Sequence, residues 1–115
     1  MPALSRHQIL AANDRKPIEV DVPEWGGAVM LQVMSGQERE SIEREWTSTS
    51  EKLIPFYKEK MLVRCISGAD GEPLFSEEDL VALGAKNAST IDTLFKRAMR
   101  LNGFEKDSVE EAAKN

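Results

Sequence analysis

The sequence has few of the residues from which catalytic sites and metal sites are built. Its 115 residues include one cysteine, Cys65, and one histidine, His7. A single cysteine excludes an internal disulfide and a cysteine-based metal cluster, and it fits a reducing compartment. His7 has no serine, cysteine or carboxylate at a spacing typical of a catalytic site, so we expect an exposed histidine on a short helix. Cys65 is expected to pack as a small apolar residue. An enzyme is therefore the least favoured class.

Long apolar runs and excess positive charge are also missing. No segment approaches the ~20 consecutive apolar residues of a membrane span, and residues 1–14 lack the apolar stretch of a secretory signal. Twenty acidic residues outnumber fifteen basic ones, for a net charge of −5, which disfavours a nucleic acid partner. Lys96, Arg97 and Arg100 could form a local basic face, or simply the solvent side of an amphipathic helix. We expect a cytoplasmic protein that binds neither membrane nor nucleic acid.

The composition is that of one small globular domain, with 41% hydrophobic and 30% charged residues. Apolar and polar residues alternate in segments 16–22 and 28–34, which predicts two half-buried strands. Residues 23–27 contain a proline and paired glycines, a turn that would join these strands in a β-hairpin. An isolated hairpin is marginally stable, so other elements must cover its apolar face.

Helical patterns supply that cover. Five helical patterns occur. The second begins at the capping box of Ser35 and Glu38, and the others lie at residues 5–12, 56–66, 76–83 and 88–102. Pro55 is expected in the first turn of the third helix, although β-branched residues there leave a strand open. Gly84 and Gly103 are expected to end the last two helices.

We therefore predict an α+β fold: a small single domain in which a β-hairpin packs against four to five short helices. Residues 1–104 form this domain. Residues 105–115 are a polar C-terminal tail or a short surface helix. Three acidic residues, 77–79, complement the dipole of a helix N-terminus more simply than they would bind a cation.

Two tryptophans favour a binding protein. Trp25 lies on the predicted turn, where it either covers the hairpin or provides an exposed anchor of the kind that dominates binding interfaces. Trp46 lies on a strongly charged helix, where it either packs with Ile42 on the hairpin or is exposed. The free edge of a two-stranded sheet could also recruit another chain.

Two stretches of the first half resemble a known family. Residues 22–27 read Val-Pro-Glu-Trp-Gly-Gly, and residues 35–39 read Ser-Gly-Gln-Glu-Arg after a strand. This order is similar to the opening of tail assembly chaperones from long-tailed, non-contractile phages. In the second half, residues 70–76 (Asp-Gly-Glu-Pro-Leu-Phe-Ser), an acidic capped helix ending at Leu83-Gly84, and residues 87–103 agree with it.

The resemblance spans about residues 5–103 and has no counterpart for residues 47–55. It implies a non-enzymatic chaperone, without a cofactor, that binds the long helical tape measure protein. The chaperone keeps this protein soluble and helps recruit tail tube protein in the host cytoplasm, and it is absent from the mature virion. Such chaperones are commonly made in a short form, which this chain resembles, and in a longer form extended by a −1 ribosomal frameshift. Both forms usually form homo-oligomers.

The expected contacts with the partner are exposed apolar residues on the hairpin turn and on two helices: Trp25, Trp46, Phe95 and Met99. The codons of Ala113-Lys114-Asn115 could contain a slippery heptamer, which would produce the extended form. The alternative function is a structural head–tail connector or minor tail protein that stays in the virion. A small regulator that binds nucleic acid is a third class, which the acidic balance disfavours.

Overall fold

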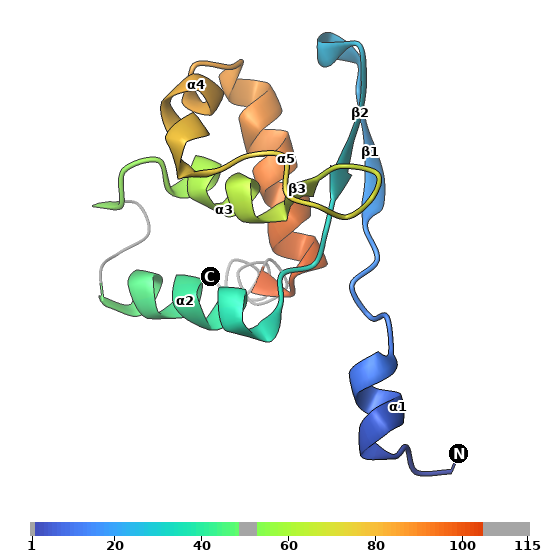
Figure 1. Cartoon of the computed structure of the whole chain (residues 1–115). Helices are drawn as coiled ribbons and strands as arrows, with labels where there is room; N and C mark the ends of the chain where they lie inside the picture. Colours follow the sequence, from blue (N-terminus) through green and yellow to red (C-terminus); the bar gives the residue numbers. More distant parts are fainter. Residues whose placement is uncertain (1, 49–52, 105–115) are drawn as a thin grey trace, which may run out of the picture.

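The computed structural model describes residues 2–48 and 53–104 (Figure 1). The predicted tail, 105–115, and the centre of the unassigned segment 47–55 lie outside these residues. In order, the elements are α1 (Arg6–Ala11), β1 (Ile18–Val22), the 3₁₀ helix η1 (Pro23–Trp25), β2 (Gly27–Leu31), α2 (Gly36–Ser48), α3 (Tyr57–Cys65), β3 (Ile66–Ser67), the 3₁₀ helix η3 (Glu77–Asp79), α4 (Leu80–Gly84) and α5 (Ala88–Leu101). The predicted α+β class is confirmed, with a third strand added to the hairpin.

The hairpin forms where the alternating residues predicted it. β1 and β2 pair antiparallel, with Ile18 opposite Leu31 at one end and Val22 opposite Gly27 at the other. Val20 and Val22 are buried, at 6% and 3% exposure, while the intervening acidic side chains are exposed. The chain turns at Gly26, whose φ of 82° is a conformation that glycine adopts readily.

The second strand is shorter than predicted. It ends at Leu31, three residues before the predicted end at residue 34, because the backbone beyond it bonds to helices. The amide of Gln32 donates to the carbonyl of Cys65 (2.7 Å), and that of Met34 donates to the side chain of Asn102 (2.8 Å). β1 begins at Ile18, directly after Pro17, which has no amide to contribute to a sheet.

Helices α3 and α5 form the centre of the core beneath the sheet. Because apolar residues recur along each helix at helical spacing, both bury one face. The largest fully buried side chains of the core are Leu31, Ile42, Met61, Leu62, Cys65, Ile66 and Leu94. The third strand, β3, follows α3 without a break and pairs with β2, so that the sheet order is β1-β2-β3. The sequence did not reveal β3, since two residues are too few to show an alternation.

Two predicted helix boundaries are wrong. α3 begins at Tyr57 rather than at Pro55, because Phe56 adopts a left-handed conformation with φ of 57°. Gly84 is the last residue of α4, not a left-handed residue after it. A Cβ atom at Gly84 would lie 3.2 Å from Cε1 of Phe56, so glycine lets that ring approach the helix. Gly103, with φ of 83°, ends α5 as predicted.

Candidate protein-binding groove

An apolar groove lies beside the tip of the hairpin. It consists of two adjoining hollows of about 420 and 310 Å³ that share Trp25 and Phe75, and we call it the Trp25–Phe75 groove. The larger hollow is lined further by Ala28, Val29, Met30, Ile66, Ser67, Gly68, Ala69 and Leu74. The smaller one is completed by Asp79, Ala82, Leu83 and Lys86. The groove therefore combines the sheet, the loop after β3, and α4.

The hairpin tip holds Trp25 in place. Its neighbour Glu24 accepts a hydrogen bond from Oγ1 of Thr90 (2.9 Å), at the start of α5. This contact ties the tip to the core, since Thr90 is 3% exposed. Trp25 is 36% exposed. The indole thus lines the groove while part of the ring stays exposed to solvent. Trp25 therefore has features of both predicted roles, covering the hairpin and providing an exposed anchor.

The loop after β3 supplies another part of the lining. Leu74 is 60% exposed, whereas Phe75 is half-buried and packs against the core. A bridge between Ser67 and Pro73 and a hydrogen bond from the amide of Leu74 to the carbonyl of Ile66 (3.4 Å) fix the start of this part of the lining. The sequence analysis missed Leu74 and Phe75 as site residues. The available signal was a pair of adjacent apolar residues just before an acidic helix start.

A buried hydroxyl group lies in the lining of the larger hollow. Ser67 is 3% exposed, and its Oγ atom has no hydrogen bond partner among the described residues. Its neighbours in the lining are mostly apolar, which suits a partner surface of the same kind.

The four residues expected to bind a partner lie in different places. Of these, only Trp25 lines the groove. Trp46 is half-buried and contacts Phe104, after the end of α5, with tilted rings whose centroids are 5.5 Å apart. Phe95 is half-buried and meets the ring of Tyr57 edge to face at 5.6 Å. Met99 is 6% exposed in the core.

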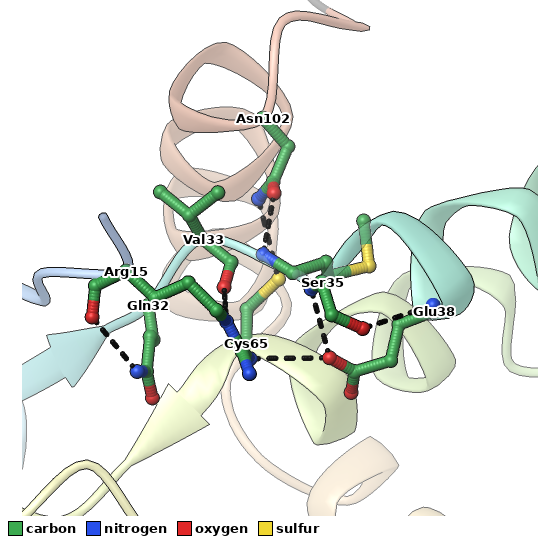
Figure 2. Close-up of polar contacts among 8 residues, drawn as sticks. Arg15, Gln32, Val33, Ser35, Glu38, Cys65 and Asn102 are labelled. Carbon is green, nitrogen blue, oxygen red and sulfur yellow. Dashed lines mark hydrogen bonds and ion pairs between the residues drawn. The ribbon is translucent and has the colours of Figure 1, made fainter. Parts of the chain in front are cut away.

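A polar junction near the C-terminal end of β2 holds Arg15, which precedes β1, in place (Figure 2). The guanidinium of Arg15 donates to the carbonyl of Val33 (3.0 Å) and forms an ion pair with Glu38 (3.1 Å). The carbonyl of Arg15 accepts a hydrogen bond from the side chain of Gln32 (3.0 Å). Glu38 also accepts from the amide of Ser35 (2.9 Å), which completes the predicted capping box of α2.

Asn102 forms the buried part of this junction. Its Oδ1 accepts from the amide of Met34 (2.8 Å), while its Nδ2 donates to the carbonyl of Ala98 (2.9 Å) and to Sγ of Cys65 (3.5 Å). Burial raises the pKa of the Cys65 thiol to about 12. The thiol therefore stays protonated near neutral pH, which makes it a poor nucleophile. The junction thus connects β2, α3 and α5 and offers no reactive group.

Neither a metal centre nor a membrane-spanning helix is visible in residues 2–48 and 53–104. Within these ranges no three histidine, cysteine or acidic residues are grouped to hold a metal ion. The helices described there are also too short or too polar to cross a membrane.

Exposed apolar surface of this kind marks interaction sites for proteins or other ligands. Residues 6–115 match the phage tail assembly chaperone family, and the chain belongs to that family. The structure is similar to that of the tail assembly chaperone of bacteriophage HK97, with a TM-score of 0.59. The two sequences are 21% identical over 83% of this chain and 90% of the HK97 chain, a likeness that shows a shared fold. No match was found among curated proteins. The family resemblance inferred from the sequence is thereby confirmed.

Proposed function

We propose that this chaperone binds the tape measure protein of its phage and keeps it soluble during tail assembly. Membership of the family supports the chaperone role. The observation that carries the finer proposal is the Trp25–Phe75 groove, an apolar surface with room for side chains of another protein. The role requires no catalysis. The chaperone acts in the host cytoplasm and leaves before the virion is complete.

The chemistry of the groove suits one face of an amphipathic helix. Such helices insert apolar side chains, spaced three or four residues apart, into grooves lined by hydrophobic residues. Trp25 and Phe75 provide aromatic surface in both hollows, and Leu74 adds an exposed apolar side chain to the larger one. A groove of this size gives a small, reversible contact. Several copies bound along one tape measure protein would raise the overall affinity, which favours a homo-oligomer.

Co-expression with the tape measure protein of the same phage tests this function. The native chaperone should bring the tape measure protein into the soluble fraction and co-purify with it. Trp25→Ala should fold normally and solubilise much less of it. Leu53→Ala is the matched control, because Leu53 is 74% exposed and lies outside the groove. Unchanged solubilisation by Trp25→Ala would move the contact away from the groove, and Trp46→Ala would test the next candidate.

The proposal also has an extended form of the chain, made by frameshifting, that recruits tail tube protein. The DNA at the codons of Ala113, Lys114 and Asn115 should contain a slippery heptamer followed by an open −1 frame. Other codons there would remove this part of the proposal. If the tape measure protein stays insoluble even with both forms present, a structural protein of the virion becomes the better assignment. Purified particles would then contain this chain.

A further inference from the structure

Helix α1 has no role in the core of its own chain. It contributes no buried residue, and Leu4, Ile9 and Leu10 are 66%, 57% and 67% exposed. It lies apart from the other elements, at the end of β1 opposite the hairpin tip (Figure 1). A lone helix of six residues is marginal in water. An exposed apolar helix that the fold does not use is typical of a segment that docks on another surface.

The helix is nevertheless well specified. Ser5 and Gln8 form a complete capping box, with contacts of 3.2 Å to the amide of Gln8 and 2.9 Å to the amide of Ser5. Leu4 and Ile9 occupy the two positions of a hydrophobic staple, which places apolar side chains together at the start of the helix. Arg15 is bonded to the body of the domain, so the segment before it forms a short arm on a fixed base. We define the arm as residues 2–13.

The charge of the arm is opposite to that of the rest of the chain. Residues 1–13 contain Arg6, His7 and no acidic residue, so their net charge is +1 with His7 neutral. Because the whole chain carries −5, the remaining residues carry −6. Asp79 and Lys86 both lie in the lining of the smaller hollow, and Glu77 and Glu78 directly precede Asp79, so three acidic residues and one basic residue leave this side acidic on balance. An apolar helix with a basic first turn is therefore complementary to an apolar groove with acidic residues at one side.

We propose that the arm of one copy docks in the Trp25–Phe75 groove of a second copy, with Leu4, Ile9 and Leu10 against the apolar lining. Arg6 then faces the acidic residues beside α4. The inference uses the same groove as the proposed function: the arm occupies it in the free chaperone, and the tape measure protein displaces the arm. Since the arm and the groove are different surfaces, every copy carries one of each.

Two single substitutions test the two surfaces of this contact one at a time. Leu10→Asp disables the arm and Leu74→Asp disables the groove, and both sites are already 60% or more exposed, so the fold should tolerate them. Leu53→Asp is the control on an exposed residue in neither surface. Sedimentation velocity over a wide range of concentration measures association of the full chain, and urea unfolding checks stability.

The native chain and Leu53→Asp should associate as their concentration rises. Leu10→Asp and Leu74→Asp should each associate at least roughly tenfold more weakly, at unchanged stability. An equal mixture of these two variants should form a heterodimer, because the intact arm of one copy meets the intact groove of the other. Association of Leu10→Asp equal to the native chain would overturn the proposal. A native chain that stays monomeric, whether its arm lies on its own groove or is free, would also overturn the proposal. A mixture of the two variants that forms no heterodimer would do the same.

The same variants distinguish this inference from the proposed function. Leu10→Asp should bind the tape measure protein at least as well as the native chain, because its groove is no longer occupied. If the native chain is monomeric yet co-purifies with the tape measure protein, the arm contact is wrong and the proposed function stands. If the native chain associates through its arm but leaves the tape measure protein insoluble with both forms present, the proposed function fails alone.

Discussion

Helices α1 and α5 begin in the same way and end up in opposite environments. Ser5 caps α1, and its side chain accepts a hydrogen bond from the amide of Gln8. Asn87 caps α5, and its side chain accepts hydrogen bonds from the amides of Ser89 and Thr90. α5 buries one whole face, whereas α1 buries nothing. Capping residues therefore decide where a helix starts, and the apolar stripe decides whether the fold depends on it.

Truncating an apolar residue in each helix should give the largest difference. Leu94 is 1% exposed in α5, so Leu94→Ala should lower the free energy of unfolding by about 2–5 kcal/mol. Leu10 is 67% exposed in α1, so Leu10→Ala should change it by less than about 0.5 kcal/mol. Urea unfolding of both variants measures this difference. Similar losses in the two would mean that α1 packs against its own domain.

Removing the two caps should give a smaller difference of the same kind. Asn87→Ala takes away the acceptor for two amides of α5 and should cost about 1 kcal/mol of global stability. Ser5→Ala removes an equivalent cap but should leave global unfolding unchanged, because α1 is not part of the cooperative core. Circular dichroism during urea titration would show the first effect. A loss of global stability in Ser5→Ala as large as in Asn87→Ala would contradict this view of the arm.

The smallest change in stability should appear at alkaline pH and should come from Cys65. This thiol lies against Asn102, directly after α5. The usual pKa of a thiol is 9.0, and burial raises that of Cys65 to about 12. Above pH 9 the unfolded chain therefore loses this proton while the folded chain keeps it, so stability declines as the pH rises. By about pH 9.5 the loss should be under about 1 kcal/mol.

Cys65→Ala should remove this part of the decline. The measurement is urea unfolding of both proteins at neutral and alkaline pH. An equal decline in the native chain and in Cys65→Ala would show that the thiol is not responsible. A matching variant in the arm, Leu10→Ala, should keep the full alkaline decline, since the arm does not contact the junction.

Features that depend on nearby residues were predictable from the sequence. The alternation in β1, the capping box at Ser35, the apolar stripe of α5 and the end at Gly103 all appear where they were expected. Each is a relation between residues a few positions apart, which sequence spacing records directly.

Features that depend on distant residues were not predictable in this way. β3 exists because β2 offers it a free edge, and Gly84 is glycine because the ring of Phe56 lies against it. The groove likewise joins Trp25 to Phe75, which are far apart along the chain. Trp25 was identified as a candidate by its residue type on a turn, whereas its partners across the groove are set by the tertiary fold.

The hydrogen bond between Met34 and Asn102 has a consequence for the order of events during synthesis. Its two ends are 68 positions apart, and the bond from Thr90 to Glu24 spans 66. The ribosome releases the hairpin before α5, a hairpin alone is marginally stable, and both of these bonds need residues in or directly after α5. The nascent chain must therefore carry the hairpin without these two contacts until α5 emerges. The contact that ties the hairpin tip beside Trp25 to the core therefore forms only after Thr90 has been translated.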